Sequence, residues 1–209
     1  MDKSFDKSQD KPAKKPVDLP NIRNITISGR IGAGSTTLAK SLSKELGWRN
    51  LEGGDIFWEK VRSKLGLDSK DTNKRPDEED KIFDEELKQM LKKENHLIIE
   101  TKLAAFNAQG IGGIFKVLVI CEDENGADQT SIRIDRLLNR EEIGVSQAKE
   151  EVLEREKNDL DKWRKMYADG NSDWVYWDRK YYDLVVNTYS HNHEQSFKFV
   201  LEHLGFDQT

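Results

Sequence analysis

Residues 25–37, ITISGRIGAGSTT, constrain the fold of this chain more than any other segment. A short β-branched run ends in a glycine-rich loop, and the loop opens into the amphipathic run 38–47. Strand, loop and helix in this order are the context of a phosphate-binding loop, where backbone N–H groups and the positive end of a helix dipole converge on a phosphate. The spacing matches Gly-x-x-x-x-Gly-Lys-Ser/Thr at Gly29, Gly34 and Thr36.

The loop departs from that pattern at one position, because Ser35 stands where the motif has its lysine. We still expect the phosphates of a nucleotide to bind here, since motif, strand and helix agree. The alternative is a tight strand-to-helix turn whose glycines serve packing. Thr36 falls where the motif places a ligand of Mg²⁺. The expected nucleotide-binding residues are Gly29, Gly32, Ala33, Gly34, Ser35, Thr36 and Thr37.

From residue 21 onward, predicted strands alternate with predicted helices. Strands are expected at 22–28, 48–51, 96–100, 115–121 and 183–188, and helices at 34–46, 53–65, 76–93, 129–140, 145–168 and 193–204. Strands separated by helices pair in parallel through crossover connections. The sequence therefore predicts an α/β fold with a doubly wound, parallel, five-stranded sheet that binds ligands at the carboxyl ends of its strands.

Composition excludes several classes of partner. The chain has 209 residues, enough for one domain, and a formal net charge of −5, so it lacks the global basic field that holds nucleic acid. Its apolar runs stay short of the roughly 18 residues of a membrane helix, and its N-terminus lacks the apolar core of a signal peptide. We expect a cytoplasmic monomer that binds neither nucleic acid nor membranes.

The N-terminal segment 1–20 has a composition of its own. It holds three of the four prolines, among Lys, Asp and Ser. Such a segment buries too little apolar surface to offset the entropy lost on ordering. The sequence predicts a disordered tail over 1–20, followed by a folded domain over 21–209.

Two further features are candidates for phosphate chemistry. Glu100 ends a predicted strand, so its carboxylate should lie beside the loop and could hold Mg²⁺ through water. Arg133, Arg136 and Arg140 share one helical face, and Arg155 lies on the next helix. Guanidinium groups match phosphate oxygens and stabilise the charge of a transferring phosphoryl group. The alternatives are a solvated strand-end acid and an ordinary charged helix face.

Short motifs along the chain occur in a specific order: ITISG with GAG, then Gly54-Asp55-Ile56-Phe57, Ile98-Ile99-Glu100, Arg133-x-x-Arg136-x-x-x-Arg140-Glu141, Arg155-Glu156 and Tyr182–Thr188. In this order and spacing the chain resembles the cytidylate kinases, especially their short archaeal-type branch, over about 22–204. The resemblance implies a phosphate-loop core similar to adenylate kinase, with a monophosphate-binding helical insert at 53–95 and a lid at 126–156. It also implies Mg²⁺–ATP as the donor and CMP or dCMP as the acceptor.

The resemblance also assigns residues to roles. It implies substrate-binding residues Asp55, Trp58, Arg62 and Lys102, catalytic cations Arg30, Arg136, Arg140 and Arg155, and metal-binding residues Thr36 and Glu100. The chain departs from the family at Ser35, at Trp58, where the family has an arginine that reaches the acceptor phosphate, and at Thr101-Lys102, where it has Gly-Arg. We expect Arg30, Arg62 and Lys102 to supply the missing positive charge.

Three functions stay open at this point. The first is an active nucleoside monophosphate kinase. The second is a nucleotide-binding protein with little or no turnover. The third is a phosphate-loop kinase of another small substrate, such as a nucleoside. Positive charge near Trp58 would favour the first, because a nucleoside brings no phosphate that needs cations.

Overall fold

The computed structural model describes residues 14–67, 69–140 and 143–206, apart from the side chains of residues 69, 70, 73 and 140. Five strands form one parallel sheet in the order β2-β3-β1-β4-β5. They are β1 (Asn24–Gly29), β2 (Arg49–Glu52), β3 (Leu97–Glu100), β4 (Ile114–Ile120) and β5 (Leu184–Asn187). The predicted fold class is confirmed.

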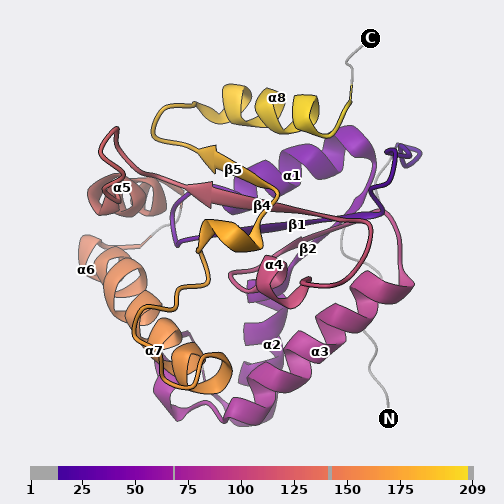
Figure 1. Ribbon diagram of the computed structural model, residues 1–209. Helices are drawn as coiled ribbons and strands as arrows, with labels where there is room; N and C mark the ends of the chain where they lie inside the picture. Colours follow the sequence, from indigo (N-terminus) through magenta and orange to yellow (C-terminus); the bar gives the residue numbers. More distant parts are fainter. Residues whose placement is uncertain (1–13, 68, 141–142, 207–209) are drawn as a thin grey trace.

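Helices cover both faces of this sheet (Figure 1). One face carries α1 (Ser35–Leu46) and α8 (His193–His203), and the other carries α2 (Gly53–Leu65), α3 (Asp77–Lys93) and the short α4 (Ala104–Asn107). The β4–β5 connection contains α5 (Thr130–Arg140), α6 (Val145–Lys149), the π-helical η2 (Glu150–Arg155) and α7 (Glu156–Tyr167). Two 3₁₀ segments, η1 (Ser69–Lys74) and η3 (Arg179–Tyr181), complete the elements.

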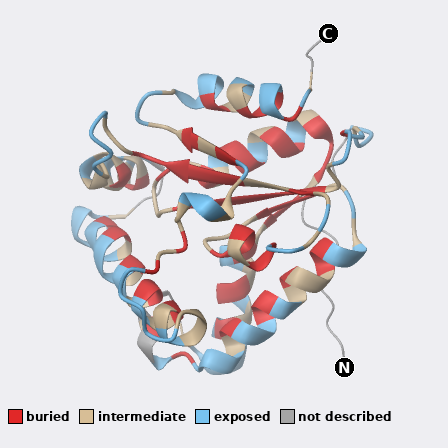
Figure 2. Cartoon of the chain, viewed as in Figure 1, coloured by how far each residue is buried: buried red, intermediate tan, exposed pale blue. Residues whose placement is uncertain are grey.

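The strands are buried because helices lie on both sides of them. Every residue of β1 is buried, and Figure 2 shows the buried residues concentrated in the sheet and on the inner faces of the helices. The side of the sheet under α1 and α8 forms one apolar cluster with Leu42, Leu46 and Trp48 at its centre. The other side packs against α2 and α3. Near-continuous apolar strands are typical of parallel sheets covered on both faces.

Residues 14–20, which the composition assigned to the disordered tail, instead pack against the domain. The Val17 N–H donates to the Leu46 carbonyl at 2.9 Å, and the Trp48 indole N–H donates to the Val17 carbonyl at 2.8 Å. Leu19 is buried in the cluster under α1. The segment is ordered because it caps the end of α1 and covers Trp48; residues 1–13 lie outside the described residues.

Most predicted elements agree with the observed ones within two residues. The sequence did not reveal α4, η1 or η3, which are too short to show a helical period. Throughout the described parts of the chain, no helix combines the length and apolar character needed to cross a membrane.

The Asn24 side chain holds three backbone groups together at the start of the sheet. Its Nδ2 donates to the carbonyls of Leu91 at 3.2 Å and Glu94 at 2.8 Å, and its Oδ1 accepts from Leu97 N at 2.9 Å. Asn24 is fully buried. One side chain therefore joins β1, the end of α3 and the start of β3.

We expect Asn24→Ala to lower the free energy of unfolding by about 2–4 kcal/mol, because it leaves buried backbone groups unsatisfied. Urea denaturation measures this loss. Asn125→Ala, at an exposed turn, is the control and should change stability by less than about 0.5 kcal/mol. Equal stability of the two variants would contradict the role assigned to Asn24.

Candidate active site

The glycine-rich loop connects the end of β1 to the start of α1. Gly34 caps α1 with a φ of 106°, and Gly32 has a φ of 79°. A Cβ at Gly32 would lie 2.4 Å from the Arg133 carbonyl oxygen, so only glycine fits where α5 approaches the loop. The first N–H groups of α1 have no partner within the helix and are available to an anion. The backbone thus has the form that a phosphate site needs.

Ser35, at the lysine position of the motif, bonds to the strand-end acid. Its Oγ donates to Glu100 Oε1 at 2.7 Å. Glu100 pairs in register with Ile27 on the neighbouring strand β1, which sets its carboxylate beside the loop as predicted. A serine hydroxyl and a carboxylate, with Thr36 adjacent, offer the hard oxygen ligands that Mg²⁺ prefers. Among the described residues no three His, Cys, Asp or Glu side chains gather to hold a metal ion alone.

Arg30, expected to supply charge to the phosphates, is engaged by the β4–β5 connection. Its guanidinium pairs with Glu156 at 2.5 Å and with Asp128 at 3.0 Å. The same group lies over the Trp177 ring, 4.5 Å from its centroid. Two carboxylates therefore balance the Arg30 charge in this state, and its role toward a nucleotide stays a prediction.

Glu156 also bonds to the loop itself. Its Oε2 accepts from the Ile31 N–H at 3.3 Å and lies 3.3 Å from Arg133 Nη1. Arg133 is fully buried and donates to the Ile31 carbonyl at 2.7 Å. The helices of the β4–β5 connection are thus fastened to the glycine-rich loop through buried ionic bonds.

Arg136 binds the other end of the loop. Its Nη1 donates to Thr188 Oγ1 at 2.7 Å, its Nη2 donates to the Thr188 carbonyl at 2.7 Å, and its Nη1 lies 3.4 Å from the Ala33 carbonyl. Together with the loop and residues 188–193 it lines a pocket beside α1. The side chain of Arg140, a predicted catalytic cation, lies outside the part of the chain that the structure describes.

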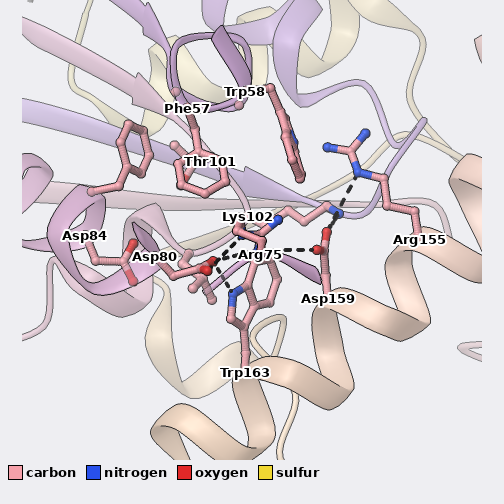
Figure 3. A pocket seen from close by; sticks show the side chains of 14 residues that line it. Phe57, Trp58, Arg75, Asp80, Asp84, Thr101, Lys102, Arg155, Asp159 and Trp163 are labelled. Carbon is pink, nitrogen blue, oxygen red and sulfur yellow. Dashed lines mark hydrogen bonds and ion pairs between the residues drawn. The ribbon is translucent and has the colours of Figure 1, made fainter. Parts of the chain in front are cut away.

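A second pocket is lined by residues of α2, α3, η2 and α7 and by the segment that follows β3 (Figure 3). Its walls are aromatic, formed by Phe57, Trp58, Phe83 and Trp163. Thr101 and Lys102, which directly follow Glu100, form part of its lining. Residues 100–102 therefore join the two halves of the site, because Glu100 touches the glycine-rich loop while the next two residues face the aromatic pocket.

Asp159 from α7 gathers cations in the aromatic pocket. It accepts from Lys102 Nζ at 2.7 Å, and Arg75 Nη2 and Arg155 Nε lie 3.8 Å and 3.9 Å from its oxygens. Burial alone would favour the neutral acid, but Lys102, Arg155 and Arg75 together hold the pKa of Asp159 below its ordinary value. Burial lowers the pKa of Lys102, against the attraction of Asp159.

Asp80 from α3 binds two cations, Lys162 and the same Arg75 that approaches Asp159. Arg75 donates to both of its oxygens, at 2.9 Å and 2.7 Å, and Lys162 Nζ lies 2.8 Å from it. Asp80 and Asp159 together thus face four cationic side chains. A third carboxylate, that of Glu151, pairs with Arg155. The pocket therefore combines aromatic walls with a cluster of buried cationic side chains held by Asp80 and Asp159.

The structure brings only some of the predicted substrate-binding residues into this pocket. Trp58 and Lys102 line it, whereas Asp55 and Arg62 are exposed on α2 and do not. Arg155, which the resemblance assigned to catalysis, also lines this pocket. Sequence reasoning missed the lining residues Arg75, Asp80, Asp84 and Asp159. Asp80 and Asp84 lie four residues apart on α3, and Asp159 lies four residues after Arg155. Helical spacing was therefore the signal that could have revealed these three acids.

Asp84 is a buried acid of the pocket whose pKa is raised. It accepts from Asn107 Nδ2 at 2.7 Å and from the Tyr167 hydroxyl at 2.5 Å. Burial raises its pKa from 3.8 to about 6, although both hydrogen bonds favour the charged form. The folded protein therefore binds a proton at Asp84 more tightly than the unfolded chain does.

This shift predicts a pH-dependent effect of Asp84→Asn. The stability that protonated Asp84 contributes is present below pH 4 and is lost as pH rises through about 6, whereas asparagine does not titrate. The stability of Asp84→Asn relative to the wild type should therefore rise between pH 4 and pH 7, by up to about 3 kcal/mol. Urea unfolding across this range measures it. Asp135→Asn, on an exposed side chain, should give a flat difference, and a flat difference for Asp84→Asn would contradict the assignment.

Comparison with known proteins agrees with this geometry. Residues 28–154 match the family described as AAA domain. A cytidylate kinase of Natronomonas pharaonis is 32% identical over 167 residues, which cover 78% of this chain and 80% of the relative. A cytidylate kinase of Sulfurisphaera tokodaii is 30% identical over 185 residues, covering 87% of this chain and 95% of that protein.

Similarity in fold extends further than similarity in sequence. The shikimate kinase of Bacteroides thetaiotaomicron superposes with a TM-score of 0.55 at 16% identity, over 88% of this chain and 98% of that one. This likeness concerns the architecture alone. The sequence relatives, the glycine-rich loop and the parallel sheet agree with one another, and the chain belongs to the cytidylate kinase family of phosphate-loop kinases.

Proposed function

We propose that the protein transfers a phosphoryl group from Mg²⁺–ATP to a nucleoside monophosphate, CMP or dCMP. The observation that carries this proposal is the pairing of two pockets through residues 100–102. One pocket adjoins the glycine-rich loop, and the other combines aromatic walls with the cationic side chains Arg75, Lys102 and Arg155. An aromatic wall suits a base, and the cations suit a phosphate. Relatives named cytidylate kinase support the choice of acceptor.

On the donor side, the loop residues 29–37 would cradle the phosphates with backbone N–H groups. Thr36 and Glu100 would hold Mg²⁺, which neutralises phosphate charge when bound. Arg136 lies at the mouth of the donor pocket, next to the Ala33 carbonyl. Movement of Arg136 or Arg30 toward the phosphates would bring positive charge to the transferring group.

On the acceptor side, Lys102 and Arg155 would orient the monophosphate. An oxygen of its phosphate attacks the γ-phosphorus of ATP, the bond from that phosphorus to the β–γ bridging oxygen breaks, and ADP leaves. Residues of this chain supply position and charge rather than covalent chemistry, as in other phosphoryl transfers.

One observation favours a second candidate, a nucleotide-binding protein with little turnover. The loop has no lysine, and the Ser35 hydroxyl that takes its place bonds to Glu100 rather than adding charge. Transfer then depends on cations from outside the loop. A nucleoside kinase is disfavoured, because a nucleoside brings no phosphate to match Arg75, Lys102 and Arg155 in the acceptor pocket.

A substrate panel tests these candidates. The protein is incubated with Mg²⁺–ATP and, separately, CMP, dCMP, UMP, AMP, GMP, cytidine and deoxycytidine, and the products are separated by chromatography. Formation of CDP or dCDP with stoichiometric ADP supports the proposal. Phosphorylation of a nucleoside in preference to its monophosphate overturns it. Binding of ATP with no transfer to any acceptor favours the nucleotide-binding protein.

A prediction specific to the metal concerns Glu100. We expect Glu100→Gln to lower kcat by about 10²-fold and to raise the Mg²⁺ concentration needed for half-maximal rate, because a charged ligand near the metal is lost. The matched control is Glu52→Gln, since Glu52 occupies the same register on the next strand but pairs with Lys40 at 3.1 Å. Similar kinetics in both variants would remove Glu100 from the metal site.

A further inference from the structure

Arg75 is a buried cation whose hydrogen bonds are incomplete. Arg75 is 4% exposed. Its Nε and Nη2 donate to the two oxygens of Asp80. Among the described residues its Nη1 has no hydrogen-bond partner and is shielded from solvent. Leaving a buried charged donor unsatisfied is costly, and such a group in a native structure calls for a reason.

Two aromatic rings of the pocket hold the guanidinium of Arg75. Its guanidinium carbon is 4.8 Å from the centroid of Phe57 and 4.7 Å from that of Trp58. Both rings line the aromatic pocket, as does Arg75 itself (Figure 3). Aromatic faces hold a guanidinium in a fixed plane and leave its edge available for hydrogen bonds.

The positive charge of Arg75 is not consumed by Asp80. Lys162 shares that carboxylate at 2.8 Å and also donates to the Arg75 carbonyl at 2.6 Å. Lys162 also lies 3.4 Å from Asp77, so Asp80 is one member of a wider ionic cluster and does not pair with Arg75 alone. Asp159, the next acid, is 3.8 Å from Arg75 Nη2 and is bonded to Lys102. Arg75 and Lys102 thus both approach Asp159, and both line the aromatic pocket.

We propose that Arg75 is a phosphate-binding residue for the acceptor, with its Nη1 edge donating to the phosphate of the nucleoside monophosphate while Phe57 and Trp58 hold its plane. The planar fork of an arginine matches phosphate oxygens, and a phosphate oxygen would satisfy the buried Nη1 donor that has no partner among the described residues. The inference rests on the proposed function and adds to it a residue outside the sequence motifs. A purely structural ion pair with Asp80 is the competing explanation.

Binding of CMP and of cytidine to Arg75→Ala, measured by calorimetry, separates these explanations. A phosphate contact predicts that affinity for CMP falls by about 10²-fold while affinity for cytidine changes less than about threefold. A structural role predicts equal losses for both ligands. Arg75→Lys, which keeps charge but loses the fork, should lie between wild type and Arg75→Ala for CMP.

The matched control is Lys74→Ala, because Lys74 neighbours Arg75, is exposed and pairs with Asp71 outside the pocket. It should leave both affinities unchanged. In steady-state assays Arg75→Ala should raise the KM for CMP with the KM for ATP within about twofold of wild type. If Arg75→Ala does not fold, by thermal melting, Arg75→Lys provides the same comparison of CMP with cytidine.

The outcomes also separate this inference from the proposed function. A wild type that forms CDP, combined with equal losses of CMP and cytidine affinity in the Arg75 variants, overturns the inference and leaves the kinase proposal standing. A wild type that binds neither CMP nor cytidine overturns both. A loss confined to CMP supports Arg75 as the phosphate contact.

Discussion

The parallel pairing of all five strands is the constraint on which the site depends. Parallel strands end at one edge, so the glycine-rich loop after β1, Glu100 at the end of β3 and Thr188 after β5 meet there. The ends of β2 and β3 approach so closely that a Cβ at Gly53 would lie 2.2 Å from the Thr101 methyl carbon. The position of β1 between β3 and β4 puts the loop at the centre of this edge, with one pocket on either side.

Buried charge fastens the β4–β5 connection to this edge. Arg30, Arg133, Asp128 and Glu156 form a network in which each charge has an opposite partner. Such a network contributes little net stability relative to apolar packing, but loss of one member leaves a costly unpaired charge. Its value lies in geometry, because it sets where the connection meets the glycine-rich loop.

The sequence predicted the fold and the phosphate loop well, because both follow from local patterns. Hydrophobic periodicity located the five strands, and the position of Glu100 at a strand end placed it beside the loop. The acceptor pocket was predicted only in part. Trp58 and Lys102 adjoin family motifs, whereas Arg75 reaches the pocket from the segment before α3, whose path depends on tertiary packing.

The same dependence on tertiary packing explains why the contacts of Arg30 and of residues 14–20 were not predicted from the sequence. Sequence placed Arg30 within the loop, but it could not show that two distant carboxylates would bind its side chain. The polar composition of residues 1–20 outweighed Val17 and Leu19 in the prediction, although these two apolar residues pack against the cluster that contains Trp48. The monomeric state and the cytoplasmic location stay predictions.

Helix α7 touches both halves of the site from a single turn. Glu156 bonds to the glycine-rich loop, and Asp159, one turn later, bonds to Lys102 in the aromatic pocket. A helix turn is stiff, so a displacement that releases one carboxylate also shifts the other. By thermodynamic linkage, a ligand that moves Asp159 then changes the affinity of the loop for its own ligand, and the reverse effect has the same magnitude. The first turn of α7 thus carries one ionic contact to each half of the site.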